Sequence, residues 1–571
     1  MYDLVIRNGK IVDGSGEASF MGDIAIKGDR IVKIGLVEDK GNKEIDAEGN
    51  LVTPGWVDIH THYDGQVCWD EYLTPSCWHG VTTVVMGNCG VGFAPVKPGT
   101  EEFLVQLMEG VEDIPGVALN EGVSWDWESF PEYLDSIGKK NYAMDIGAMI
   151  GHGPIRSYVM GMDRCQGKEE ASDEEINEMA KITKEAIEAG ALGFSTSRTY
   201  LHRDKFGEYV PGTEATAKEM RKIANTIADL GQGTLEIVSD WMDQDIELDW
   251  VKEFVEKSDR TLTYAQTGGN PVETWKYCEE NFSKGVKIRP QFPGRPTGML
   301  FSLESTVHPF IAHPSYGEIA DKTLEEKVAV MKDESFRQKI LSEEPAVDKN
   351  HMIYTLMMSF DKQFPMNEIP DYEPSYEESI AGIAESSGKS VMEVMYDELL
   401  KNEGKTFVWA PFSPYPDHNL DTYKMMMEFE SSVAGLSDGG AHCGLICDAS
   451  MPTWNIAHYT RDRVKGDKIP LEFLIRKQTK ETAETFGLMD RGQIKEGYLA
   501  DINIIDHENL CVYKPEMVHD LPTGSRRIIQ KAGGYIATIK SGVVTFKNDQ
   551  ATGELPGTVL RGERTAEAIS A

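Results

Sequence analysis

The chain has 571 residues, of which 40% are apolar and 26% charged, and its formal net charge is −37. This length allows a large domain together with a smaller one, and the composition is that of a globular protein rather than a disordered one. Because so acidic a surface repels phosphate backbones and anionic lipids, we expect neither a nucleic-acid partner nor a membrane partner.

The start of the chain and its cysteines bear on the cellular compartment. The opening residues MYDLVIRNGKIVDG lack a basic start followed by a long apolar core, so we expect no signal peptide. No stretch approaches the roughly 18 apolar residues of a membrane span. The eight cysteines contain no CxxC pair, and an even count in so long a chain does not indicate a disulfide framework. We therefore expect a cytoplasmic protein with free thiols.

Both ends of the chain have the pattern of short strands. Apolar and polar positions alternate there, and turns containing Gly with Asn or Asp separate the runs. These runs are residues 2–14, 23–35, 43–55, 500–510 and 535–546. We predict one small β-sandwich domain formed from both chain termini, residues 1–53 and 490–571.

The middle of the chain alternates between buried strands and helices. Residues 174–190 and 217–231 have helical spacing and end at Gly. The predicted strands are residues 56–59, 80–88, 142–153, 191–196, 232–239, 260–267, 286–292, 406–412 and 431–440. This alternation predicts a parallel sheet with crossovers.

About eight strands favour a closed barrel, so the predicted fold class is α/β, a (β/α)8 TIM-like barrel over residues 54–489. An open doubly wound sheet is the structural alternative. The mostly helical and acidic stretch near 313–400 is interpreted as an insertion.

The strongest local feature is TPGWVDIHTHYDG, in which an apolar strand ends in His60-Thr61-His62. Positions i and i+2 of a strand point to the same side, so both imidazoles can reach one ion at the carboxyl end of the strand. That end carries the active site in barrels, and imidazole suits Zn²⁺. Although an HxH pair can simply be polar residues at a loop start, Asp58 and Asp64 nearby favour a metal site.

A second β-branched strand, GVTTVVMGNCG, runs into Cys89. A metal-bound thiol loses its proton outright, so Cys89 could be a thiolate ligand at another strand end. A small buried cysteine is the equal alternative.

The third feature is SSVAGLSDGGAH, where an apolar run ends in Asp438 and is followed closely by His442. A carboxylate there can bind the metal and move protons as the general base that a metal-activated water needs. An Asp-Gly turn is the alternative. Its place on what would be the last barrel strand favours catalysis.

Other polar residues stand at predicted strand ends and could line a pocket. Taken singly, each fits a supporting role at least as well. They are His152, Tyr200, His202, Glu236 and Gln266.

These motifs together resemble the amidohydrolase superfamily, and within it the N-acyl-D-amino-acid deacylases. The markers occur in family order: LVIRNGKIVDG, LVTPGWVDIHTHYD, GVTTVVMGNCG, GAMIGHGPIR, GALGFSTSRTY, GLSDGGAH and DRGQIKEGYLADINIID. The resemblance implies that His60 and His62 hold the metal and that Cys89 replaces a carboxylated lysine. It also implies that Asp438 is the acid/base and that Tyr200 faces the substrate carboxylate.

The chain departs from this family at strands five and six. The deacylases supply two further zinc-binding histidines there, whereas this chain has Glu236 and Gln266 as the nearest polar residues. His152 falls in the family's GHG segment. The expected cofactor is therefore one or two zinc ions, held by His60, His62, Cys89 and Asp438.

The sequence thus predicts a zinc-dependent hydrolase acting on a C–N amide bond of a small molecule, an N-acyl-D-amino acid by resemblance. A cyclic amide or imide hydrolase or a deaminase would share the same water chemistry, and a catalytically silent metal-binding barrel is a third alternative. A homo-oligomer is compatible with the large loops and the helical insertion.

Overall fold

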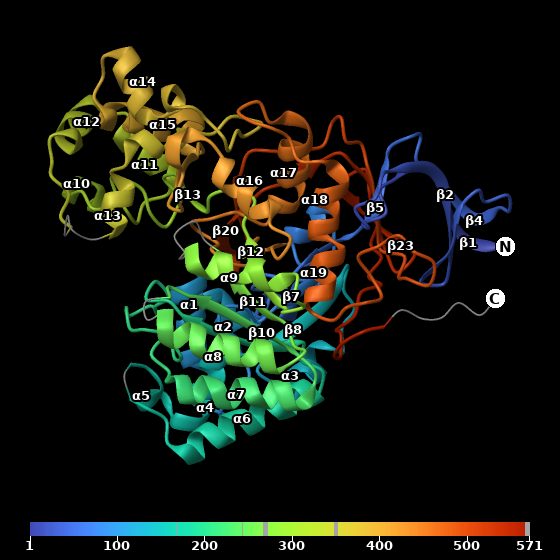
Figure 1. Ribbon diagram of the computed structural model, residues 1–571. Coiled ribbons are helices and arrows are strands. Elements are labelled where there is room, and N and C mark those ends of the chain that lie inside the picture. Colours follow the sequence, from blue (N-terminus) through green and yellow to red (C-terminus); the bar gives the residue numbers. More distant parts are fainter. Residues whose placement is uncertain (168, 242–243, 267–271, 348–351, 566–571) are drawn as a thin grey trace.

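The computed structural model describes the whole chain apart from residues 168, 242–243, 267–271, 348–351 and 566–571. Eight parallel strands form the central sheet (Figure 1). In chain order they are β6 (Trp56–Asp58), β7 (Val81–Met86), β8 (Asp145–Gly151), β9 (Gly193–Arg198), β10 (Thr234–Ser239), β11 (Leu262–Ala265), β12 (Ile288–Phe292) and β16 (Val433–Ala434).

This sheet closes on itself between its first and last strands. Thr61 and Gly439, just beyond β6 and β16, form a parallel bridge. The backbone N–H of His62 donates to the Gly439 carbonyl at 2.7 Å, and that of Asp438 donates to the His60 carbonyl at 3.1 Å. The closure therefore brings the carboxyl ends of the first and last strands together, with their polar residues.

Helices separate the strands and cover the outside of the barrel. Most of them lie between one parallel strand and the next, as a parallel sheet requires, while α17, α18 and α19 follow the last strand, β16. They are α1 (Glu101–Glu112), α2 (Gly116–Gly122), α3 (Phe130–Ile137), α4 (His152–Met160), α5 (Met162–Cys165), α6 (Asp173–Glu188), α7 (Ala217–Leu230), α8 (Gln244–Lys257), α9 (Val272–Phe282), α16 (Asp421–Glu428), α17 (Met451–Ala457), α18 (Leu471–Gln478) and α19 (Lys480–Thr485).

The two helices predicted from spacing show why the sequence folds this way locally. Helix α6 begins with a capping box, in which Ser172 and Glu175 satisfy each other's backbone N–H groups. Helix α7 begins at the Thr216 cap and ends at Gly231, whose φ of +63° stops the helix. Each helix buries one apolar face. Among the described residues, no helix is long and apolar enough to cross a membrane.

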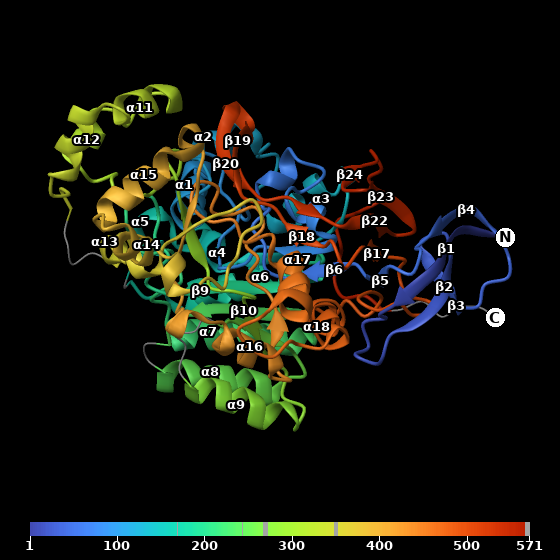
Figure 2. The same ribbon diagram turned by 90° about the horizontal axis from the view of Figure 1, so that it is seen from above.

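Strands from both ends of the chain share one mixed sheet, at the same side of the molecule in both views (Figures 1 and 2). Its central strands alternate polarity, and their apolar side chains form one cluster that draws on both ends of the chain. The strands are β1 (Tyr2–Ile11), β2 (Phe20–Lys27), β3 (Arg30–Gly35), β4 (Gly41–Asp46), β5 (Leu51–Pro54), β17 (Ile502–Ile505), β22 (Tyr535–Lys540), β23 (Val543–Lys547) and β24 (Gln550–Ala551). The predicted fold class, a barrel with a small β domain from both termini, is confirmed.

Two further strand pairs lie in the C-terminal part. They are β18 (Cys511–Val512) with β21 (Ala532–Gly533), and β19 (Glu516–Leu521) with β20 (Ser525–Ile529). The β19–β20 hairpin reaches the barrel rim, because the Ile528 N–H donates to the Cys443 carbonyl at 2.6 Å.

A helical region interrupts the barrel between β12 and β16, on the side opposite the mixed sheet (Figures 1 and 2). It has an apolar cluster of its own. Its elements are β13 (Gly298–Phe301), α10 (Pro314–Gly317), α11 (Leu324–Met331), α12 (Glu334–Leu341), α13 (Met352–Met357), β14 (Phe364–Pro365), α14 (Ile380–Ser387), α15 (Val391–Gly404) and β15 (Val408–Pro411). Segment 406–412 was predicted as a barrel strand, but it pairs with β13 and β14 instead. The prediction was wrong because periodicity does not reveal which sheet a buried strand joins.

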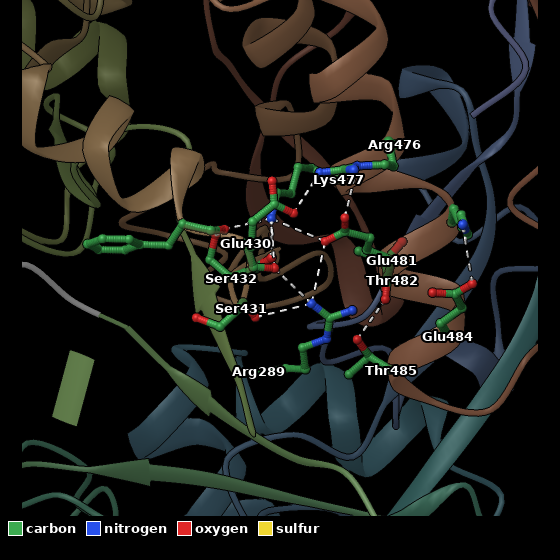
Figure 3. A network of polar contacts seen from close by, with 12 residues as sticks. Arg289, Glu430, Ser431, Ser432, Arg476, Lys477, Glu481, Thr482, Glu484 and Thr485 are labelled. Carbon is green, nitrogen blue, oxygen red and sulfur yellow. Dashed lines mark hydrogen bonds and ion pairs between the residues drawn. The ribbon is translucent and has the colours of Figure 1, made fainter. Parts of the chain in front are cut away.

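Ion pairs tie the amino ends of the barrel strands to their surroundings. The carboxylate of Asp145, the first residue of β8, forms ion pairs with Arg491 at 2.7 Å and with Lys540 at 2.9 Å. At the start of β12, Arg289 joins a second network (Figure 3). There the buried Lys477 ammonium donates to the carbonyls of Phe429, Glu430 and Ser432 and pairs with Glu481 at 3.2 Å. This end of the barrel is thus closed by paired charges.

Candidate active site

Four predicted side chains converge at the carboxyl end of the barrel. Nε2 of His60 lies 3.4 Å from Cys89 Sγ and 3.4 Å from Asp438 Oδ1. Nε2 of His62 lies 4.0 Å from Cys89 Sγ and 3.6 Å from the same Asp438 oxygen. The His60, His62 and Cys89 ligand atoms all lie within 4.8 Å of one another, and all three residues are buried. The structure therefore joins residues from the ends of β6, β7 and β16 in one cluster.

The distances from the two imidazoles to Cys89 and to Asp438 suit neighbouring ligands of a zinc ion. Zn–N bonds of about 2.0–2.1 Å and Zn–S bonds of about 2.3 Å place neighbouring ligand atoms about 3.3–3.6 Å apart. Three of the four measured separations fall in that interval, and the fourth exceeds it by a few tenths of an ångström. Two imidazoles, a thiol and a carboxylate are also the donor types that zinc prefers.

The charges around Cys89 point to a cation as well. Burial raises the pKa of the Cys89 thiol well above its usual value, and Glu112, Glu236 and Asp438 raise it further. A thiolate in such surroundings needs a positive neighbour, which a bound metal ion would be. The donor set therefore fits the predicted ion.

Opposing effects set the charges of the other three groups. Burial lowers the pKa of His60 to about 4. Burial also disfavours a charged His62, but Glu112 and Asp438 outweigh it and raise the pKa of His62 to about 9. Burial alone would raise the pKa of Asp438, yet the surrounding imidazoles His60, His62 and His442 hold it far below its usual value. The carboxylate of Asp438 is thus ionised.

Two side chains that contact His60 and His62 were missed in the sequence. Gln291 Oε1, in β12, accepts from Nδ1 of His60 at 2.8 Å. Glu112 Oε1, at the end of α1, lies 3.3 Å from Nδ1 of His62. Outer partners of this kind fix the tautomer and orientation of a metal-binding histidine. A polar residue at the end of the strand VKIRPQF was a signal for Gln291, whereas Glu112 looks like any acidic residue of its helix.

Three more carboxyl groups lie buried behind the cluster. Asp58 accepts from the Ser437 hydroxyl at 2.5 Å, and burial raises its pKa to about 7. Asp64 accepts from the Gly87 N–H at 3.2 Å, and burial raises its pKa to about 6. Glu236 accepts from the Cys89 N–H at 3.2 Å, and burial raises its pKa to about 8. Strand β10 thus places Glu236 against the backbone of Cys89.

His442 and His202 lie near Asp438. Nε2 of His442 lies 4.0 Å from Asp438 Oδ2 and 3.7 Å from Glu112 Oε2, and its side chain is 21% exposed. His202 is partly buried, with Nδ1 2.9 Å from the Ser197 hydroxyl. Burial lowers the pKa of His202 to about 3, and the nearby imidazoles His442 and His62 lower it further. Both imidazoles therefore lie close enough to the carboxylate to interact with it electrostatically.

The remaining predicted residues have other surroundings. Both ring nitrogens of the fully buried His152 are engaged, one with Thr196 and one with Glu219, each at 2.8 Å. The Gln266 oxygen is buried and accepts from Tyr264 at 2.9 Å, while position 267 lies outside the described residues. The structure thus places both side chains in supporting networks.

Tyr200 lies on the loop after β9. It is 39% exposed, and its ring packs edge-on against Tyr209 at 5.1 Å between centroids. Its backbone N–H donates to Asp240 at 2.8 Å. Tyr200 is thus a rim residue in this structure rather than part of the buried cluster.

Three residues of the site have strained backbone conformations. Cys89, Asp438 and His442 have φ values of +57°, +50° and +54°, in the left-handed region that side chains with a Cβ rarely adopt. Such conformations often occur at functional sites, where the surrounding structure enforces them.

Comparison with known proteins agrees with this geometry. The family model described as "Amidohydrolase family" matches residues 43–546. The chain is similar to D-aminoacylase from Alcaligenes xylosoxydans xylosoxydans, with 26% identity over 98% of this chain and 97% of that protein. It is also similar to N-acyl-D-aspartate deacylase from the same organism, with 31% identity over 35% of this chain and 37% of that protein.

Solved structures agree on the fold. A D-aminoacylase structure described with a binuclear metal centre covers 99% of this chain and 100% of its own, at a TM-score of 0.64 and 22% identity. An N-acyl-D-glutamate deacylase from Bordetella bronchiseptica, in complex with zinc and a phosphonate inhibitor, covers 98% and 99%, at a TM-score of 0.63 and 20% identity. Together with the family match over most of the chain, these relatives support metal-dependent hydrolysis of a carbon–nitrogen bond. The chain belongs to the amidohydrolase family.

Proposed function

We propose that this protein is a zinc-dependent hydrolase that removes the acyl group from an N-acyl-D-amino acid or a related N-acyl compound. The observation that carries the proposal is the convergence of the His60, His62 and Cys89 ligand atoms within 4.8 Å of one another, with Asp438 Oδ1 3.4 Å and 3.6 Å from the two imidazoles. The similarity to D-aminoacylase over nearly the whole chain supports the substrate class.

His60, His62 and Cys89 would hold the ion, with Asp438 beside it. When bound, zinc lowers the pKa of a water molecule and polarises the substrate carbonyl. Asp438 accepts a proton from the attacking water. It then gives that proton to the leaving nitrogen, so the acid and the amine separate as products.

The surroundings of Asp438 supply the proposed substrate contacts. His442 and His202 present imidazoles beside the carboxylate, where they can bind polar groups of the substrate. Glu236 is a further candidate, because it is buried next to Cys89. Tyr200 would act from the rim, and His152 and Gln266 would act through the networks that hold the neighbouring strands.

The metal site is tested with the double variant His60→Ala with His62→Ala. We expect zinc content, measured by elemental analysis, to fall to background and hydrolysis to fall by about 10³-fold or more. A double variant that keeps both zinc and activity would show that the assignment is wrong.

The substrate class is tested with a panel of N-acyl amino acids of both hands, hydantoins and cyclic imides. We expect turnover of N-acyl-D-amino acids. Turnover of the cyclic compounds alone would favour a cyclic amidase. Bound zinc without turnover on the whole panel would favour a catalytically silent barrel. This outcome is worth testing because Glu236 and Gln266 stand where the deacylases have histidines on strands five and six.

The proposed setting is the cytoplasm, with a small-molecule substrate. All eight cysteines are free, which supports a reducing compartment. The net charge of −37 supports the absence of nucleic-acid and membrane partners.

A further inference from the structure

The end of helix α1 places a buried carboxylate between two imidazoles. Glu112, the last residue of α1, is 1% exposed. One carboxylate oxygen lies 3.3 Å from Nδ1 of His62, and the other lies 3.7 Å from Nε2 of His442. Glu112 thus contacts both a proposed zinc ligand and the imidazole beside Asp438.

Among the described residues, no other group forms a hydrogen bond with the two atoms of the Glu112–His62 contact. Nδ1 of His62 and Oε1 of Glu112 both lack another hydrogen-bond partner there. The two atoms are close enough for an ion pair but imperfectly aligned for a hydrogen bond, as catalytic contacts often are before substrate binds. With Nε2 of His62 turned toward Cys89 and Asp438, Nδ1 is the nitrogen left for an orienting partner.

The same helix end also holds the loop that carries His442. The His442 N–H donates to the Glu112 carbonyl. Next to it, Asp113 accepts from the Gly444 N–H at 3.0 Å and from the Thr306 hydroxyl at 3.2 Å. Asp113 and His442 have φ values of +50° and +54°, so the two segments meet in strained conformations. The position of His442 therefore depends on the end of α1.

We propose that Glu112 is a positioning residue that orients His62 for zinc through Nδ1 and holds His442 against Asp438. This inference rests on the proposed zinc site. In this arrangement, Nδ1 of His62 faces the Glu112 carboxylate, just as Nδ1 of His60 faces the side-chain amide of Gln291. Outer partners of metal-binding histidines typically change metal affinity by about 10–100-fold when they are lost.

The test is the zinc affinity of Glu112→Met, measured by competition with a chromogenic chelator. Methionine keeps the buried volume but offers no acceptor to Nδ1, so we expect affinity to fall about 10–100-fold. Glu112→Gln restores an acceptor oxygen and should recover part of the loss. The matched control is Glu109→Met, one turn earlier on α1, where the carboxylate is 34% exposed and pairs with Lys205 at 3.3 Å. We expect wild-type zinc affinity from the control.

Thermal unfolding of the zinc-free variants separates positioning from folding. A purely structural Glu112 would lower the unfolding midpoint without a matching, graded loss of affinity through Gln to Met. Should Glu112→Met not fold, Glu112→Gln carries the same comparison at smaller amplitude.

The role of the contact between Glu112 and His442 is tested by measuring kcat at saturating zinc. We expect the kcat of Glu112→Met to remain about tenfold or more below that of the wild type even when zinc is saturating. Because the two residues act together, the double variant Glu112→Met with His442→Gln should have a kcat only slightly lower than that of Glu112→Met. Zinc affinity of Glu112→Met within about twofold of wild type would overturn the inference while leaving the proposed function intact. A wild-type chain that binds no zinc would overturn both. Zinc binding without turnover would overturn the proposed function alone, and the affinity series would still decide the role of Glu112.

Discussion

The two ends of the barrel bury charge in different ways. At the amino end, Asp145 is fully matched: Arg491 and Lys540 contact one oxygen, and the Thr558 N–H donates to the other at 2.9 Å. Lys540 in turn pairs with Asp501 at 3.0 Å. At the carboxyl end, Nδ1 of His62 and oxygens of Glu112 and Glu236 lack hydrogen-bond partners among the described residues.

This difference separates buried charge that the chain itself completes from buried polar atoms that the described residues leave without a hydrogen bond. A buried ion without partners is strongly destabilising, so a fold tolerates it only where something else completes the set. At the amino end, the completing groups belong to the chain itself. At the carboxyl end, the donor set suits a metal ion and a substrate.

Replacing the catalytic carboxylate should sharpen the contrast most. In Asp438→Asn, the shape of the site remains but the proton acceptor is lost, so we expect kcat to fall by about 10²–10⁴-fold while zinc stays bound. Rates and elemental analysis on one preparation measure both. A variant that keeps wild-type kcat would remove Asp438 from proton transfer.

Replacing the structural carboxylate should have the opposite profile. Asp145→Asn leaves Arg491 and Lys540 partly uncompensated in a buried position, so we expect the free energy of unfolding to fall by about 3–5 kcal/mol. The activity per folded molecule should stay at the wild-type level. The midpoint of urea unfolding measures the first quantity, and an unchanged midpoint would contradict the comparison.

Acidic pH should reduce the difference in stability between the wild type and Asp145→Asn. Burial alone would raise the pKa of Asp145, but Lys540 and Arg491 outweigh it and lower the pKa below its usual value. A carboxyl with a lowered folded pKa contributes its full stability above the unfolded value of about 3.9 and loses it as pH falls through the folded pKa. The gap in unfolding midpoint between wild type and Asp145→Asn should therefore be largest near neutral pH and shrink below about pH 4. A gap that stays constant from pH 7 to pH 3 would show that ionisation of Asp145 is not its source.

Local patterns were enough to predict the barrel and the convergence of His60, His62, Cys89 and Asp438. His60 and His62 share one strand end, and Cys89 and Asp438 each follow an apolar strand, so the rule that parallel strands place their carboxyl ends together predicted their meeting. The helices α6 and α7 were readable for the same reason, since their caps and apolar faces lie in continuous sequence.

Features that depend on distant contacts could not be predicted in this way. Glu112 meets a histidine 50 positions earlier, and nothing in EEFLVQLMEGVED distinguishes it from the exposed acids of that helix. Segment 406–412 has the composition of a barrel strand, yet its partners are β13 and β14. His152 sits in a family motif, but only the fold shows that Thr196 and Glu219 occupy both its nitrogens.

The pairing of β13 with β15 has a consequence for assembly. Gly298 lies opposite Pro411 and Phe301 opposite Val408, so the chain leaves the barrel and returns to it at nearly one place. Once this pair has formed, the remaining path from β12 to β16 consists of residues 293–297 and 412–432, whatever the length of chain between β13 and β15. Because the entropy of closing a loop rises by only about 0.6 kcal/mol for each doubling of length, helices can be gained or lost there at little cost to barrel closure. The helical region, with an apolar cluster of its own, is therefore expected to tolerate changes of length without disturbing the carboxyl end of the barrel.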